Sequence, residues 1–470
     1  LAALVERWRP EIHTFHLPEG EMTITLQDVA VLLGLPIQGT PVIGSTRAAW
    51  PDLAQRLLGV DILSDRSATN GASISMPWLE AQIPILADDT DEQTVMRYAR
   101  AYILRLIGGT MCTDHSGMHV HMMYLPLLED FDREETYSWG SACLAYTYRA
   151  LCRISDRRCT CLGGCVILIH MWAWDHIPTF CPDLAGPPVE MAVLHDAPRG
   201  RWWCQRHNFD VVPRQHLGVY RLQLDCLLPD QISWLPYWSI MDQLPAYCTV
   251  GLEDAMAVVP LIHFHIIEWQ QPDRVMRQFF RTQPIPLPSR QTDKLHGMKL
   301  TGRQDDDWSQ VHAIFIDCWH RRAELRIQGV PTNRFSLSEQ VDYAPWYRLK
   351  SILYLTQAGI EMQRMGSHTE QLVRMSDEEE GVFIRVAVHA AALGARESFH
   401  ALFESIFERP TRREEVLAPK EHPAAAAGAE EPRPRRRRQG RASREASPVP
   451  QAEVGPLVVQ HQPIQDVPQV

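Results

Sequence analysis

Hydrophobic residues along most of the chain recur every three or four positions, the spacing that places them on one face of a helix. This spacing predicts helices over residues 94–107, 138–151, 162–174, 260–269, 307–322 and 347–362. Gly108 and Gly109 end the first of these. No fixed period repeats along the chain, which argues against a solenoid. The predicted fold class is therefore mainly α, with many helices.

The first 43 residues follow a different pattern. Residues 1–8 carry a helical stripe, and apolar segments at 15–17 and 22–25 flank Pro18 and Gly20, which predicts a hairpin. Thr25 is placed to cap a helix that ends before Gly34, and residues 37–43 predict a short returning strand. We expect this small N-terminal element to hold the β structure of the chain.

The helical pattern is lost after residue 408. Residues 409–470 contain ten prolines, an alanine run at 424–427 and no aromatic residue. Such a segment cannot bury enough apolar surface to offset the entropy of ordering it. The sequence predicts a folded domain over 1–408 and a disordered Pro/Ala/Arg-rich tail over 409–470.

Charge is divided unevenly between these two parts. The formal net charge is −11, but the tail holds eleven Lys and Arg against eight Asp and Glu, so the body is near −14. An acidic body argues against a protein that coats nucleic acid over its whole surface. The tail arginines suit nuclear import or phosphate contact, with a merely solvated charge run as the alternative. They are Arg433, Arg435, Arg436, Arg437, Arg438, Arg441 and Arg444.

Cysteine number and hydropathy limit the cellular setting. Eleven cysteines are too few for a disulfide scaffold, and an odd number fits free thiols in a reducing compartment. The longest apolar stretch, Cys165 to Trp174, is interrupted by His170 and falls short of the ~18 residues of a membrane span. We predict no membrane segment and no secretory signal.

Two groups of residues have metal-ligand chemistry. Cys152, Cys159, Cys161 and Cys165 lack the paired C-x2-C spacing of structural zinc sites, so buried thiols on two helices explain them better. The second group surrounds Gly117, which favours a loop, and ordinary loop histidines explain it better than zinc. Its candidate ligands are Cys112, His115, His119 and His121. We predict no bound metal and no cofactor.

Catalytic constellations are not recognisable in the sequence. The chain has four lysines, Lys294, Lys299, Lys350 and Lys420, and none follows a glycine-rich phosphate cradle, which disfavours a pyridoxal-phosphate enzyme. The segments that carry metallophosphatase ligands are missing. Asp305, Asp306 and Asp307 are adjacent and are better interpreted as a helix cap than as a transposase triad. We therefore expect a non-enzyme without a small-molecule substrate.

Tryptophans and two arginines complete the candidate residues. The apolar spacing around Trp139 and Trp172 predicts that both are buried on neighbouring helices of one core. Core packing is favoured over a nucleic-acid stacking platform. Arg274 and Arg277 are expected to face solvent or to be ion-paired, with Asp273 as a possible partner.

Several long segments occur in an order that is similar to a known family. They are Leu4–Pro18, Met22–Pro36, Tyr137–Cys152, Leu162–Trp174, Gln231–Tyr237, Pro272–Phe279 and Trp346–Arg348. Together they resemble the plant mobile domain, also called aminotransferase-like, of meristem-maintenance and serine/threonine phosphatase 7 long form-like proteins. The resemblance is clearest over 1–360. Its signature residues are Trp8, Tyr137, Trp139, Gly140, Trp172, Trp174, Trp234, Asp273, Arg274 and Trp346.

The resemblance implies a function that the residues alone do not show. It implies a non-catalytic nuclear protein of transposon ancestry, acting in meristem maintenance and in transposon or gene silencing. The expected partners are nuclear proteins or chromatin, with nucleic acid contacted through the basic tail. The alternative is a transposase-derived nucleic-acid-binding or residual strand-transfer protein of a mobile element. Relatives carry helical sequence before the position of Leu1, so the domain is expected to be truncated there.

Overall fold

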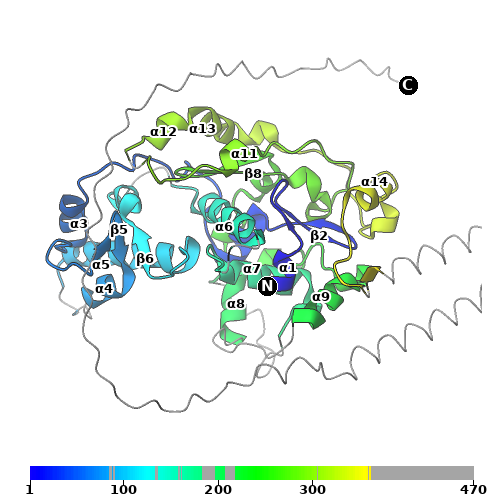
Figure 1. Ribbon diagram of the computed structural model, residues 1–470, viewed down its shortest axis with the longest axis horizontal. Coiled ribbons are helices and arrows are strands. Elements are labelled where there is room, and N and C mark those ends of the chain that lie inside the picture. Colours follow the sequence, from blue (N-terminus) through cyan, green and yellow to red (C-terminus); the bar gives the residue numbers. More distant parts are fainter. Residues whose placement is uncertain are drawn as a thin grey trace, which may run out of the picture. The chain divides into compact units, whose positions relative to one another are not determined.

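A computed structural model of the chain describes residues 1–360, apart from 84–86, 88–89, 133–135, 157–158, 160, 183–195, 207–216, 304 and 358. Figure 1 shows that helices dominate this part and that the strands form small, separate sheets. The mainly α fold class is confirmed. The predicted boundary at 408 and the disordered tail lie outside the described residues and stay predictions.

The first sheet is built from the N-terminal segment and is fully antiparallel. Helix α1 (Ala2–Val5) leads into β1 (Trp8–Arg9), which pairs with β2 (Thr14–Leu17), and β2 pairs with β3 (Gly20–Met22). The predicted hairpin is confirmed. The predicted helix over 1–8 is wrong at its end, because Trp8 pairs with Phe15 across the sheet. Residues 37–43 form isolated bridges rather than a strand of their own.

Helix α2 (Leu26–Leu33) begins where the sequence predicts. Thr25 and Asp28 form a reciprocal capping box, and Gly34 ends the helix at a φ of 67°. The cap satisfies backbone N–H groups that have no partner within the helix, and the left-handed φ is one that glycine adopts without strain. These two local signals explain why this helix is readable from sequence.

A second group of elements packs around its own hydrophobic cluster. It contains α3 (Trp50–Leu58), α4 (Met76–Ala81) and α5 (Glu92–Leu106), which continues as a π-helix over Ile107–Met111. A small antiparallel sheet joins β4 (Thr69–Asn70), β5 (Ser73–Ser75) and β6 (His119–His121), followed by a 3-10 helix over Met122–Leu128. The expectation that β structure is confined to the N-terminal element is therefore wrong.

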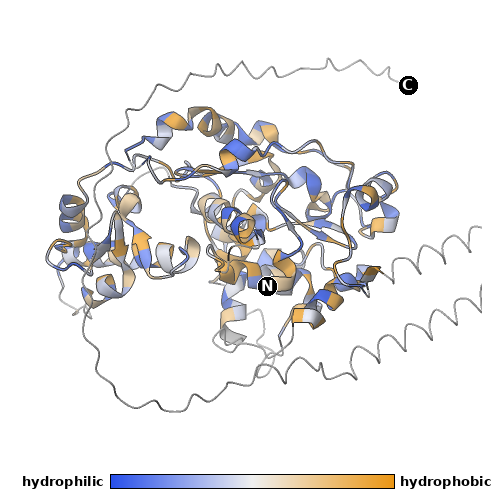
Figure 2. Cartoon of the chain, in the orientation of Figure 1, coloured by the Kyte–Doolittle hydropathy of each residue, from blue (hydrophilic) through white to orange (hydrophobic). Residues whose placement is uncertain are grey.

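Two central helices carry the main hydrophobic cluster. They are α6 (Trp139–Ser155) and α7 (Val166–His176), and both are buried on most sides. Figure 2 shows hydrophobic residues gathered around α7. A helix that is apolar on all sides belongs in the interior of a large domain. Both helices confirm the predicted periodic segments.

Residues 260–269 form a hairpin, not the predicted helix. Strand β7 (Val259–His263) pairs with β8 (Ile266–Gln270) in register from Val259 opposite Gln270 to His263 opposite Ile266. Every residue of both strands is buried, so the period of two that marks a half-exposed strand is absent. The hairpin turns at Phe264, whose φ is 47°. Helix α6 packs against both strands.

Shorter elements complete the described fold. They are α8 (Arg199–Arg206), α9 (Leu217–Asp225), α10 (Ala246–Thr249), α11 (Asp293–His296), α12 (Trp308–Val311), α13 (Ala313–His320) and α14 (Tyr343–Lys350). The predicted helix over 307–322 is thus divided into two. Of the helix predicted over 347–362, α14 covers the first residues and ends at Lys350, and the described residues become helical again from Gln357. None of the described helices is long and apolar enough to span a membrane.

The tryptophan prediction is half right. Trp172 is fully buried in the main cluster, whereas Trp139 is half-buried and packs against the second cluster. The reason is the position of Trp139 at the first turn of α6, where Gly140 meets the segment that follows α2. A Cβ on Gly140 would lie 2.8 Å from the Ile37 side chain and 3.0 Å from the Pro36 carbonyl oxygen.

A buried histidine, cysteine and carboxylate cluster as candidate functional site

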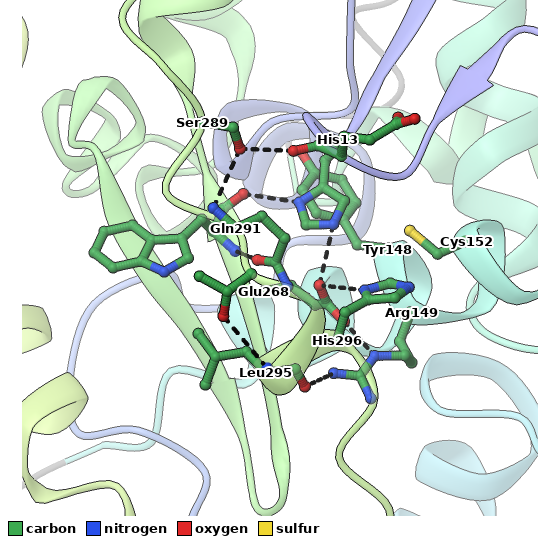
Figure 3. Close-up of polar contacts among 12 residues, drawn as sticks. His13, Tyr148, Arg149, Cys152, Glu268, Ser289, Gln291, Leu295 and His296 are labelled. Atoms are coloured by element: carbon green, nitrogen blue, oxygen red, sulfur yellow. Dashed lines mark hydrogen bonds and ion pairs between the residues drawn. The ribbon is translucent and has the colours of Figure 1, made fainter. Parts of the chain in front are cut away.

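Glu268 is the centre of a polar cluster where β8 crosses α6. Its side chain is fully buried, and Arg149 of α6 donates from Nε to Oε1. The two terminal nitrogens of Arg149 donate to the backbone oxygens of Leu295 at 3.0 Å and Met298 at 2.9 Å. The arginine therefore joins α6, β8 and α11 in one network (Figure 3).

Two histidines face the other oxygen of Glu268. His13 Nε2 lies 3.0 Å from Oε2, and His296 Nδ1 lies 3.3 Å from the same atom. Burial by itself raises the pKa of Glu268, but the His13 and His296 contacts and the Arg149 charge outweigh it and hold that pKa well below its ordinary value. Glu268 is therefore an ionised carboxylate inside the core.

The His13 ring is held in one orientation by its surroundings. Nδ1 lies 3.0 Å from the carbonyl oxygen of Trp269, and the ring packs against Tyr148 at a centroid distance of 4.9 Å. The residue itself has a φ of 54°, which non-glycine residues rarely adopt. The backbone carbonyl occupies one ring nitrogen, and the other is directed at Glu268.

Cys152 completes the cluster from one turn further along α6. Its thiol is buried and accepts a hydrogen bond from Nε1 of Trp8 at 3.1 Å. One ligand atom each of His13, Cys152 and His296 lie within 4.8 Å of one another, so these three side chains of the described residues could hold a metal ion. Burial raises the pKa of the Cys152 thiol well above its ordinary value, and the Glu268 charge adds to this.

The two candidate arginines are buried, which corrects the expectation of a solvent-facing role. Arg274 pairs with Glu21, not with Asp273, and Nη1 lies 3.2 Å from each oxygen of that carboxylate. The Arg277 guanidinium lies 3.8 Å above the ring of Trp234, a cation–π contact, and donates to the Phe335 carbonyl at 2.8 Å. Burial lowers the pKa of Arg277.

The comparisons with known proteins now decide the family. The family model of the plant mobile domain matches residues 1–348. This chain belongs to the plant mobile domain family. The match contains all four members of the cluster around Glu268 and confirms the resemblance predicted from sequence.

Three curated relatives from Arabidopsis thaliana are similar to this plant mobile domain. The serine/threonine-protein phosphatase 7 long form homolog is 38% identical over 355 residues, which are 74% of this chain and 26% of that protein. Protein MAIN-LIKE 1 is 34% identical over 78% of this chain and 69% of its own length. Protein MAINTENANCE OF MERISTEMS is 31% identical over 74% of this chain and 68% of its own length. The chain thus spans about a quarter of the phosphatase 7 long form homolog. No solved structure is significantly similar to this chain.

The predicted metal candidates of the plant mobile domain do not converge. Cys112 is buried at the end of the π-helix, while His119 and His121 sit at opposite ends of the three-residue strand β6. His115 lies in the loop that Gly117 bends at a φ of 62°, as predicted. In the described residues these four do not form a metal-ligand group. The dispersed set at Glu268 was missed because its members are not neighbours in sequence.

The prediction of buried thiols holds for only part of the other sequence group. Cys165 is buried just before α7, but Cys159 is half-buried and Cys161 is exposed, and both lie between α6 and α7. Cys152, the fourth member of that sequence group, faces the histidines instead. Spacing along the chain therefore grouped Cys152 with the wrong residues.

Asp306 and Asp307, of the three adjacent aspartates, form local contacts. Asp307 caps α12 by accepting from the Ser309 backbone N–H at 3.0 Å, and Asp306 pairs with Arg303 at 2.6 Å. The helix-cap interpretation of Asp307 is confirmed.

The signature aromatics are distributed through the cores of the plant mobile domain. Trp8, Trp172, Trp174 and Trp234 are buried, whereas Tyr137, Trp139 and Trp346 are half-buried. Core packing, predicted over a stacking platform, fits the buried set. The seven tail arginines from Arg433 to Arg444 lie outside the described residues.

Proposed function

We propose that this chain is a non-catalytic nuclear factor that acts in meristem maintenance, of transposon ancestry and involved in transposon or gene silencing. The observation that carries the proposal is the family match over residues 1–348. One similar protein is named for the maintenance of meristems, and another is named for likeness to it. The alignments with this chain cover about two thirds of the length of each of these proteins.

Lysine positions support the non-catalytic part of the proposal. A pyridoxal-phosphate enzyme needs a lysine held within a pocket to form its Schiff base. The three lysines in the described part of the chain, Lys294, Lys299 and Lys350, are all exposed. The phosphatase name belongs to a relative of which this chain matches only 26%, so that activity is not carried over.

The arginine cluster of the tail supports nuclear entry and contact with nuclear partners. Residues 433–438 hold five arginines, while the rest of the chain is acidic. Attraction to import receptors, chromatin or nucleic-acid phosphates is therefore concentrated in this segment. Proteins or chromatin in the nucleus are the partners we propose.

Complementation tests the meristem role. The chain, expressed in Arabidopsis thaliana plants that lack Protein MAINTENANCE OF MERISTEMS, should restore an organised meristem. A Gly20→Ala variant serves as a fold-defective control, because Gly20 has no room for a side chain. If plants with abundant, folded and nuclear parent protein keep the defect, the proposed meristem role is wrong for this chain.

A charge-matched pair of variants tests the nuclear part. Changing Arg435, Arg436, Arg437 and Arg438 to alanine should move a fluorescent fusion from the nucleus to the cytoplasm. The control removes four other positive charges from the same tail, at Arg409, Arg412, Arg413 and Lys420, and should stay nuclear. Equal nuclear fluorescence of both variants would show that the cluster is a solvated charge run.

A further inference from the structure

We propose that His13, Cys152, Glu268 and His296 form a four-ligand zinc site in the core of the plant mobile domain. Figure 3 shows both imidazole rings directed at the Glu268 carboxylate, with the Cys152 sulfur beside them. The inference rests on these side chains and is independent of the proposed function.

The two histidine nitrogens lie from Glu268 at close to the separations that zinc requires, and the Cys152 sulfur lies further away. Bonds of ~2.0–2.3 Å in a tetrahedral arrangement place neighbouring ligand atoms about 3.3–3.6 Å apart. His13 Nε2 and His296 Nδ1 lie 3.0 and 3.3 Å from Glu268 Oε2, and the histidine and cysteine atoms lie within 4.8 Å of one another. Rotation of the Cys152 and His296 side chains would bring the sulfur to bonding distance of a metal at this point.

The groups around the donors already have the orientation seen around bound metals. Metal-ligating histidines donate their second ring N–H to a carbonyl or carboxylate, and His13 Nδ1 faces the Trp269 carbonyl at 3.0 Å. Arg149 binds Oε1 of Glu268 and leaves Oε2 for the cluster. The Trp8 N–H at 3.1 Å from Cys152 would stabilise a thiolate more than a thiol.

One buried contact in the cluster is poorly aligned. His13 is buried, with 1% of its surface exposed, and its Nε2 lies 3.0 Å from Glu268 in an ion-pair contact that does not have the direction of a hydrogen bond. Buried polar atoms are almost always satisfied by well-directed partners, so such an atom calls for an explanation. A metal ion between His13 and Glu268 would give Nε2 a partner along its lone pair.

The competing explanation is an ion-pair network without a metal. It would hold the Arg149 guanidinium and the two imidazole rings around one buried carboxylate and leave the Cys152 sulfur without a part in the network. A metal bound by both imidazoles and by Glu268 also gives the Cys152 sulfur a role. Mixed sulfur and nitrogen donors favour zinc over magnesium or calcium, which prefer oxygen ligands.

Four protein ligands leave no open position, which makes the site structural. The metal would tie together the turn before β2, the last turns of α6, strand β8 and helix α11. These segments are far apart in sequence, so a single ion would fix their tertiary arrangement.

Metal analysis of the full 470-residue chain, purified without a metal-affinity tag from zinc-supplemented cells, tests the proposal. About one zinc per chain is expected. His296→Gln, which removes the most exposed ligand, and Cys152→Ser should each lose the metal while far-ultraviolet circular dichroism stays parent-like. Cobalt(II) in place of zinc should give a sulfur charge-transfer band that Cys152→Ser lacks.

Matched cysteine variants serve as controls. Cys165→Ser removes another buried thiol and Cys161→Ser an exposed one, and both should keep the zinc and the cobalt band. If Cys152→Ser does not fold, the folded His296→Gln protein decides. Folded parent protein that neither contains zinc nor takes up cobalt would overturn the proposal, as would full zinc content in His296→Gln or loss of zinc in Cys161→Ser.

Discussion

Arg277 fills the space in which a side chain at Gly20 would stand. A Cβ built on Gly20 would lie 1.7 Å from Nη2 of Arg277, and the backbone φ of Gly20 is +130°. The guanidinium cannot move aside easily, because it is buried against the ring of Trp234 at 3.8 Å. The glycine at the hairpin turn and the arginine 257 positions later therefore depend on each other.

We expect Gly20→Ala to destabilise the domain by roughly 3 kcal/mol or more, because steric overlap with Arg277 adds to backbone strain. The control is Gly71→Ala, where φ is also positive, at +61°, but nothing lies within 4 Å. That variant should show the strain alone, ~1 kcal/mol. Urea unfolding measures the loss of stability in both variants. Equal losses would show that Arg277 moves freely.

A buried carboxylate at the end of α9 ties down the segment after α14. Asp225 pairs with Arg7 and accepts from the backbone N–H groups of Leu355 at 3.0 Å and Thr356 at 2.7 Å. Asp225→Asn should cost about 3–5 kcal/mol, because it leaves the Arg7 guanidinium buried without its counter-charge.

The matched control for Asp225 is Glu324→Gln. Glu324 forms a 2.8 Å pair with Arg321 in which both side chains are mostly exposed. Surface pairs contribute little, so the urea midpoint of this variant should equal that of the parent. A small loss for Asp225→Asn, comparable with the control, would show that the buried pair is dispensable.

Trp172 should be the more costly of two tryptophans to truncate. It is fully buried against Phe15 and His176, with ring centroids 5.1 and 5.2 Å away. Trp172→Ala should cost roughly 3–5 kcal/mol through lost burial and a cavity. Trp238 is 70% exposed, so Trp238→Ala should change the midpoint much less. Thermal unfolding of both compares them directly, and similar shifts would contradict the assigned cores.

His263 predicts acid sensitivity of the fold. Burial lowers its pKa from 6.5 to about 3, and charges on neighbouring groups, His265, His121 and Arg149, add to this. The unfolded chain therefore binds more protons than the folded one between these values, and stability is lost as the pH falls from 6.5 toward about 3. His263→Gln should therefore lose less stability over the same pH range. The difference from the parent in the free energy of unfolding should be on the order of a few kcal/mol, as linkage predicts.

The exposed His320 gives the control for His263. His320→Gln should leave the pH dependence of the urea midpoint unchanged, since that residue lies on the surface at the end of α13. The partners that His263 faces are Tyr124, whose hydroxyl lies 2.8 Å from Nε2, and the ring of Tyr146 at 5.3 Å. An unchanged slope for His263→Gln would mean that other groups carry the acid sensitivity.

The sequence by itself determined the helices whose ends and buried faces depend on neighbouring residues. The capping box of Thr25 and Asp28 with Gly34 marks both ends of α2, and regular apolar spacing marks α5 and α6. Long family segments also placed the chain in its family. These features depend on residues a few positions apart, so one sequence displays them directly.

Only the tertiary structure decided the β7–β8 hairpin and the cluster around Glu268. The hairpin is buried on both faces, which removes the alternation that distinguishes a strand from a helix. His13, Cys152, Glu268 and His296 meet because α6, the first sheet, β8 and α11 pack together, although Glu268 lies 116 positions after Cys152. Such convergence is a property of packing, since burial selects which distant polar groups must satisfy one another.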